Sequence, residues 1–251
     1  MSADLYAWVV WAKQWLMDTH EMASLFWIAV TLLAYSMGTA IYRRSQAHPL
    51  LLPVLTGTAA VMLLLVLTDT SYDDYFAAVH PLVFMVGPAT VALAVPLFSQ
   101  IRHLKAIWWP VTVALLTGSV VAILSALLIA WSFGGTTQTL LSLAPKSSTM
   151  PIATSLSAHF GGLVSLAAAA VAITGIAGTM LSGPVLKWAL GPLDDVVHGF
   201  TLGLTAHAIG TARALQISET AGAFAAMAMS LNGLVTALLM PLAVMWITAV
   251  A

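Results

Sequence analysis

The sequence contains no cysteine and very little charge. Without cysteine the chain can form no disulfide, bind no metal through thiolates and use no cysteine nucleophile. Only 7% of its 251 residues are charged, whereas about 25% is usual in soluble domains, and 61% are hydrophobic. The net charge of −1 excludes a polybasic surface for nucleic acid. The composition therefore indicates an integral membrane protein that is surrounded by the lipid bilayer.

Long apolar segments take the place of charged and polar surface. A hydrocarbon core of about 30 Å requires about twenty apolar residues in a helix. Six segments predict complete crossings: 24–42, 50–68, 79–98, 108–132, 162–186 and 220–249. We therefore predict an all-α polytopic membrane protein, in which residues 24–251 form one transmembrane domain and 24–133 supply its first helices.

The polar ends of these segments predict how the chain is oriented. Residues 1–23 contain charged residues among three tryptophans and no signal-peptide pattern, so we predict an N-terminal interfacial helix. Short cytoplasmic loops carry an excess of Lys and Arg. Arg43 and Arg44 follow the first crossing, and Arg102 and Lys105 follow the third. The N-terminus is therefore expected on the extracytoplasmic side.

Two further apolar segments, 138–158 and 195–216, are interrupted by polar and helix-breaking residues. Each precedes a full crossing, so 138–186 and 195–249 form twin units and predict an inverted repeat, as in many transporters. Each interrupted segment is either a re-entrant hairpin or a broken helix that crosses its twin. Hairpins would place Lys187 in the cytoplasm, which the positive-inside rule favours, but a single lysine leaves both arrangements open.

The first interrupted segment has an unusual composition for membrane depth. The run Leu143-Ala-Pro-Lys-Ser-Ser-Thr-Met-Pro-Ile152 contains one lysine, two prolines and three hydroxyls. A lysine at the centre of a membrane helix costs roughly 2.5–3.5 kcal/mol, and proline removes a backbone donor. A polar cavity would accommodate these groups, and we predict that it binds substrate through Lys146, Ser147, Ser148 and Thr149. The run is also consistent with an extramembrane loop or with a lysine that reaches the headgroups.

The second interrupted segment resembles the first. Alignment of Leu141-Ser-Leu-Ala-Pro-Lys-Ser147 with Leu202-Gly-Leu-Thr-Ala-His-Ala208 places Lys146 opposite His207. A half-helix that follows the break would direct its positive N-terminal end at the cavity, which favours an anion as ligand. We predict that this segment binds a small carboxylate through His207, Gly210, Thr211 and Arg213. Arg213 is equally consistent with a cytoplasmic anchor that pairs with Glu219.

Three titratable residues are candidates for carrying a coupled proton: His159, His207 and Glu219. Histidine titrates close to physiological pH, although a membrane histidine is also consistent with a hydrogen-bonded packing role. No residue stands at metal-ligand spacing from the histidines, and no nucleophile–base pair indicates an enzyme. We expect no metal and no cofactor. The pair Asn232-Gly233 is consistent with a helix kink or with a hydrogen bond to a neighbouring helix.

Four motifs stand in a characteristic order along the chain: Val86-Gly-Pro-Ala-Thr-Val-Ala-Leu-Ala-Val-Pro-Leu97, Leu141-Ser-Leu-Ala-Pro-Lys-Ser147 with Pro151-Ile-Ala153, Ile209-Gly-Thr-Ala-Arg-Ala214, and Asn232-Gly-Leu234. In order and spacing they resemble the LrgB/CidB family of bacterial membrane proteins. Two positions depart from that family's usual pattern. Met150 replaces a threonine, and Ala206-His207-Ala208 replaces Ser-His-Gly.

This resemblance implies two alternative functions. The family was named for control of murein hydrolase activity and autolysis, as the antiholin-associated partner of a small LrgA/CidA-like membrane protein. A plant plastid relative is a glycolate/glycerate translocator. We therefore expect a secondary transporter of small monocarboxylates such as pyruvate, glycolate or glycerate in the bacterial cytoplasmic (inner) membrane, with or without the small partner. A homodimer suits such a transporter. The alternative is a non-transporting regulator of the holin/antiholin type.

Overall fold

The computed structural model describes residues 20–45, 51–92 and 94–250, and every regular element among them is a helix. The interfacial helix predicted for residues 1–23 lies outside the described residues, apart from its last four positions. The chain divides into two compact units, Met1–Ala92 and Leu93–Ala251, each with its own helix packing.

The described helices of the first unit are α2 (His20–Arg44), α3 (Pro53–Leu67), α4 (Tyr72–Ala78) and α5 (His80–Ala92). α2 is long and apolar enough to cross a membrane, and it packs along α3. Pro53 begins α3, where its missing N–H costs no helical hydrogen bond. The hydroxyl of Ser71 caps α4 by accepting the N–H of Asp74 at 3.1 Å. The axes of α3 and α4 differ by 119°, so the chain turns sharply between them.

The second unit contains α6 (Ala94–Ser99), α7 (Ile101–Ala106), α8 (Trp108–Ser132), α9 (Thr137–Leu143), α10 (Met150–Phe160), α11 (Val164–Leu190), α12 (Asp195–Ile217) and α13 (Glu219–Val250). The crossings predicted at 108–132, 162–186 and 220–249 correspond to α8, α11 and α13. The interrupted segments correspond to the α9–α10 pair and to α12.

One of the six predicted crossings, segment 50–68, forms the 15-residue α3. In segment 79–98 the described helices are α5, which ends at Ala92, and α6, which begins at Ala94, on either side of a residue outside the described part of the chain. Pro88 removes a backbone donor within α5, and the boundary between the units falls in the same segment. The described residues contain four helices long and apolar enough to span a membrane, or five if the α3–α4 pair counts as one span. The protein is an all-α polytopic membrane protein.

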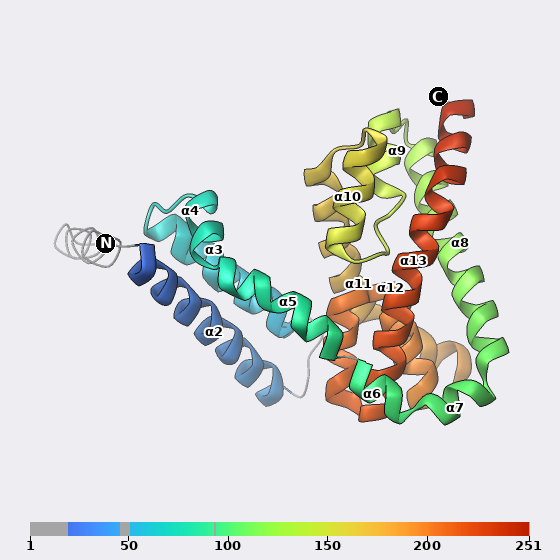
Figure 1. The fold of residues 1–251 in the computed structure, drawn as a ribbon, viewed down its shortest axis with the longest axis horizontal. Coiled ribbons are helices and arrows are strands. Elements are labelled where there is room, and N and C mark those ends of the chain that lie inside the picture. Colours follow the sequence, from blue (N-terminus) through green and yellow to red (C-terminus); the bar gives the residue numbers. More distant parts are fainter. Residues whose placement is uncertain (1–19, 46–50, 93, 251) are drawn as a thin grey trace. The chain divides into compact units, whose positions relative to one another are not determined.

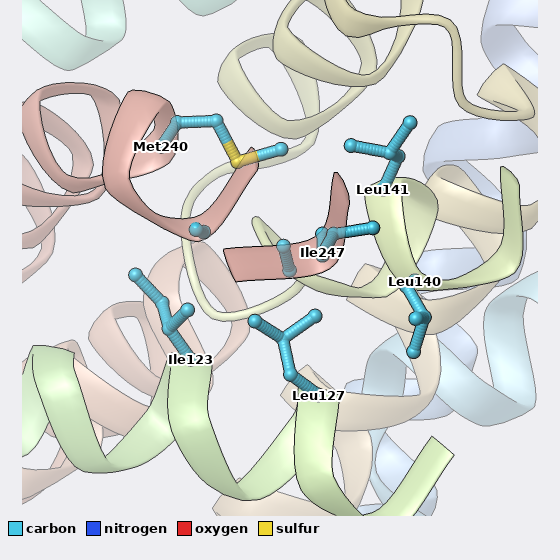
Figure 2. Packing of buried hydrophobic residues seen from close by; sticks show 8 residues of the cluster. Ile123, Leu127, Leu140, Leu141, Met240 and Ile247 are labelled. Carbon is cyan, nitrogen blue, oxygen red and sulfur yellow. The ribbon is translucent and has the colours of Figure 1, made fainter. Parts of the chain in front are cut away.

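α13 is the central helix of the second unit. Within its most apolar 18-residue window 61% is buried, compared with 28% in α8 and 22% in α11. Its first half shares one buried cluster with Val111 and Leu115 of α8. Its second half shares another with Ile123 and Leu127, which lie below Met240 and Ile247 in Figure 2. The first half of α13 thus packs against the first half of α8, and the second half against the second half. The two helices therefore run in the same direction.

The first interrupted segment is a re-entrant hairpin. α9 and α10 are separated by the non-helical residues 144–149, after which the chain returns to α9. The return is fixed by the N–H of Leu163, which donates to the hydroxyl of Ser142 at 2.7 Å. Leu140 and Leu141 of α9 belong to the cluster formed by the second halves of α8 and α13 (Figure 2).

The second interrupted segment is also a hairpin, contained within α12. His207 has φ 41° and ψ −126°, which divides the helix into two arms. Gly210 in the second arm lies against Leu202 in the first arm, since a Cβ added to Gly210 would collide with the carbonyl oxygen of Leu202. In a straight helix these two residues would be about 12 Å apart along the axis. The chain therefore folds back at His207, and the two arms are antiparallel. Phe200, in the first arm, belongs to the cluster formed by the first halves of α8 and α13.

The two hairpins enter the second unit from opposite ends. The first packs against the second halves of α8 and α13, and the second packs against their first halves. In Figure 1, α9 accordingly lies near the C-terminal end of α13. The structure thus contains inverted hairpins, not the crossed broken helices that were the other prediction from the sequence.

Candidate functional site

The first hairpin ends in an unwound turn, residues 144–149, which we call the first tip. Pro145 has no N–H, and its carbonyl oxygen accepts the N–H of Ser148 at 3.0 Å and the hydroxyl of Ser148 at 2.8 Å. The backbone N–H of Lys146 donates to the carbonyl oxygen of Leu143 at 3.1 Å. Ser148 is completely buried. The proline and hydroxyl that marked this run in the sequence therefore stabilise a tight turn.

The break at His207 forms the second tip. The ring Nε2 of His207 donates to the carbonyl oxygen of Val171 in α11 at 3.0 Å, since a carbonyl can only accept. The ring fits against α11 because Gly175 has no side chain; a Cβ there would lie 2.6 Å from Cε1 of His207. The carbonyl of His207 accepts the hydroxyl of Thr211 at 2.8 Å. Hydrogen bonds on both sides thus hold a backbone conformation that is uncommon outside glycine.

One side chain connects both hairpins. Asn232 of α13 is 1% exposed, and its Nδ2 donates to the carbonyl oxygens of Ser147 at 2.7 Å and Leu204 at 3.2 Å. Its Oδ1 accepts the hydroxyl of Ser119 in α8 at 2.7 Å. Ser119 and Asn232 lie between the two buried clusters of α8 and α13. The hairpins therefore meet at mid-height of the second unit, around one amide group.

Lys146 supplies the charge of this region. Its side chain is half-buried and has no hydrogen-bond or ion-pair partner within the part of the chain that the structure describes. It lies close enough to His207 for an electrostatic interaction. The remaining Lys and Arg residues of the described second unit belong to the end where α8 and α13 begin: Arg102, Lys105, Lys187 and Arg213. An unneutralised ammonium group at mid-height is costly, and a bound anion would neutralise it.

Comparison with known proteins identifies the family. A family model described as the LrgB-like family matches residues 31–246. The chain belongs to this family. Two curated relatives, both named "Antiholin-like protein LrgB", come from Bacillus cereus (strain B4264) and Bacillus anthracis (strain CDC 684 / NRRL 3495). Each is 28% identical over 229 residues, which cover 88% of this chain and 96% of the relative. No solved structure matches.

The family match confirms the resemblance seen in the sequence, and the matched region of this LrgB-like chain includes both tips. Seven of the predicted substrate-binding residues lie in or beside the tips: Lys146, Ser147, Ser148, Thr149, His207, Gly210 and Thr211. The hydroxyls of Ser148 and Thr211 donate to backbone carbonyls. Those of Ser147 and Thr149 have no hydrogen-bond partner among the described residues. Two hydroxyls of the first tip thus make no hydrogen bond within the described part of the chain.

Arg213 is not brought next to Lys146. It lies on the second arm of α12 and donates from Nη1 to Oε1 of Gln216 at 3.3 Å. It also interacts electrostatically with His198, near the beginning of the first arm. Because the arms are antiparallel, both residues lie toward the base of the hairpin. The cytoplasmic anchor that the sequence also allowed for Arg213 stays a prediction.

The residues proposed for proton coupling are likewise dispersed. His159 is exposed in the last turn of α10, where its ring packs edge-on against Phe160. Glu219 begins α13 and accepts the hydroxyl of Ser99 at 3.2 Å. Neither lies at the second tip with His207. Over the described ranges, no group of three or more His, Asp or Glu side chains is arranged to hold a metal ion.

Two residues at the tips were not recognised as part of the site from the sequence. Asn232 was expected to kink its helix or to bond to a neighbour, and the structure shows bonds to three partners. The available signal was an amide in a long apolar segment, where an unsatisfied polar group is costly. Gly175 gave no signal, because α11 contains several glycines of which one faces the histidine.

Proposed function

We propose that this LrgB-like protein is a secondary transporter of small monocarboxylates, such as pyruvate, glycolate or glycerate. The observation that carries the proposal is a half-buried lysine, without a partner among the described residues, where two inverted hairpins meet. Interrupted helices that meet near the bilayer midplane are typical of transporter binding sites. Lys146 would bind the carboxylate.

The side chains at the tips suit a ligand that has one negative charge and a polar group beside it. The ammonium group of Lys146 would pair with the carboxylate, and the free hydroxyls of Ser147 and Thr149 would donate to its oxygens or to an adjacent keto or hydroxyl group. Nε2 of His207 is already bonded to a backbone carbonyl, so Nδ1 is the ring nitrogen left for a substrate. With Arg213 at the base of its hairpin, Lys146 is the one cation at the tips among the described residues, which matches a monocarboxylate better than a dicarboxylate.

Entry of the hairpins from opposite ends supports alternating access. Each hairpin packs on one half of the α8–α13 pair, so displacement of one would open the site to one side while the other stays closed. The cationic end, where α8 and α13 begin, would face the cytoplasm by the positive-inside rule. We place the protein in the bacterial cytoplasmic membrane. Arg43 and Arg44 at the end of α2 favour an extracytoplasmic N-terminus.

Uptake of labelled pyruvate and glycolate into proteoliposomes tests the proposal. Lys146→Ala should reduce uptake at least about tenfold, because a hydrogen bond to a charged group contributes roughly 1.5–3 kcal/mol. Lys187→Ala is the matched control, since it removes an exposed lysine from the last turn of α11. Parental uptake by Lys146→Ala would remove this lysine from the mechanism. Absence of uptake by the parent protein, alone and with a small LrgA/CidA-like partner, would contradict transport.

A second candidate is a non-transporting regulator of the holin/antiholin type, which the names of the relatives favour. Both Bacillus relatives are called antiholin-like, and neither name mentions a transported substrate. In this role the chain would regulate murein hydrolase activity and autolysis with a small LrgA/CidA-like membrane protein, as the family resemblance implies. It would be a non-enzymatic membrane protein without a cofactor.

The same lysine variant separates the two candidates in cells. A regulator that acts through protein contacts should restore normal autolysis to a deletion strain with Lys146→Ala as well as with the parent chain. A transporter should lose both uptake and its effect on autolysis. A homodimer in which one domain stays fixed also suits transport, and the mass of the detergent-solubilised protein tests it.

A further inference from the structure

Asn232 is bonded to both hairpins and to the α8–α13 pair on which they rest. We infer that Asn232 is a positioning residue that fixes the distance between the two tips, and thereby between Lys146 and His207. That the distance between the tips is fixed follows from the hydrogen bonds alone. That this distance matters for substrate binding rests on the proposed function.

The two carbonyl groups that Asn232 binds lack the partners of a continuous helix. Leu204 lies three residues before the break at His207, so its carbonyl is among the four left over at a helix end. The carbonyl of Ser147 lies in the unwound first tip. Buried carbonyls of this kind need a donor from elsewhere in the fold. One amide with two N–H groups supplies a donor to each hairpin at once.

The chemistry of the site determines which way the amide faces. Both carbonyl oxygens can only accept, so the NH₂ group must point at them and Oδ1 must point at Ser119. The hydroxyl of Ser119 also lies 2.7 Å from the carbonyl oxygen of Leu115, so its single proton is shared. Aspartate has the shape of asparagine but would turn an acceptor toward two acceptors. As a carboxylate it donates to neither carbonyl, and as a carboxylic acid it donates to only one, so Asn232→Asp breaks at least one tip bond with the smallest change in volume.

Spin-label distances test the positioning role directly, because the chain has no native cysteine. Labels are introduced by Ser155→Cys on α10 and Thr205→Cys on the first arm of α12, both at exposed positions. The parent measured without substrate should give one narrow distance distribution, because both hairpins are then bonded to Asn232. Asn232→Asp should broaden or shift it. Ser230→Ala is the matched control on the same helix, since the Ser230 hydroxyl bonds only to the carbonyl of Ala226.

A parental distance distribution in Asn232→Asp would overturn the inference. If that variant is not recovered as folded protein, Asn232→Ser is measured in the same way. Its single short hydroxyl cannot reach both carbonyl groups, so a parental distribution there would be equally decisive. A broadened or shifted distribution in either variant, with the control unchanged, supports the positioning role.

Transport kinetics then distinguish positioning from general stability. Loss of hydrogen bonding to the tips should raise the half-saturating pyruvate concentration about tenfold in Asn232→Asp, with its thermal stability measured in parallel. Ser230→Ala should leave that concentration unchanged. If distances change but the parent shows no uptake, the positioning role stands and the transport proposal fails. If the parent transports but Asn232→Asp leaves the distances unchanged, the transport proposal stands and the positioning role fails.

Discussion

Replacing Gly203 with alanine should push the second hairpin away from α13. Gly203 lies in the first arm of α12, where an added Cβ would collide with the carbonyl oxygen of Ala225 and lie 2.7 Å from its Cα. These are backbone atoms of a helix, so no side-chain rotation can relieve the contact and the whole arm must shift. Gly199, one turn earlier, meets Ala221 in the same way. The two glycines therefore set the distance between the two helices.

The expected loss of stability is about 2 kcal/mol. Overpacking costs typically about 1–3 kcal/mol, and a backbone contact belongs at the upper end of that range. Alanine regains up to about 1 kcal/mol, because its helix propensity is higher than that of glycine. For a chain of this length, about 2 kcal/mol corresponds to a melting temperature lower by roughly 4–8 °C.

The melting temperature of the purified protein in detergent measures this loss, with size-exclusion chromatography used to detect the fraction that remains folded at each temperature. Gly183→Ala is the matched control in a neighbouring helix, since the nearest atom to its added Cβ is Nε2 of His198 at 3.8 Å. The control should be at least as stable as the parent. If Gly203→Ala has the same melting temperature as Gly183→Ala, the reasoning is refuted, because the arm would then be able to move away from α13 at no cost in stability.

Two further predictions concern the first hairpin and the topology. Ser142→Ala should lower the melting temperature, since loss of the acceptor for the N–H of Leu163 costs about 1–3 kcal/mol. Thr154→Ala is the control and should leave the melting temperature unchanged, because the Thr154 hydroxyl bonds within its own helix. Single cysteines should react with an impermeant thiol reagent from opposite sides of the membrane: Trp188→Cys, 89% exposed, from the cytoplasm and Phe133→Cys, 86% exposed, from outside. Reaction of both from one side would contradict inverted hairpins.

The helices of the second unit could be predicted from sequence because their signals are local. The crossing expected at 108–132 is α8 without any change in its bounds. Segment 79–98 was harder, since its apolar length suggested one span although the boundary between the two units falls within it. Hydrophobic length alone does not show where one compact unit of the chain ends and the next begins.

The tips were predictable for an energetic reason. A lysine and prolines are costly in an apolar segment, so Lys146 stood out, and alignment of the twin segments placed it opposite His207 at the other tip. Arg213 was misjudged as a neighbour of Lys146, because the alignment does not give the direction of the chain after the break. Six residues of helix lead about 9 Å back from the tip. The bonds of Asn232 join it to residues that are 28, 85 and 113 positions away, and no local pattern predicts them.

The two candidate functions place different demands on the first tip. A regulator that acts through its outer surface gains nothing from a half-buried ammonium group, which costs roughly 2.5–3.5 kcal/mol at membrane depth and could be replaced by any neutral side chain. A transporter needs that charge and needs it without a permanent partner, because a substrate must neutralise it reversibly. Movement of weak acids across the membrane could itself alter autolysis. An antiholin-like effect would then follow from transport, and Lys146→Ala should abolish both.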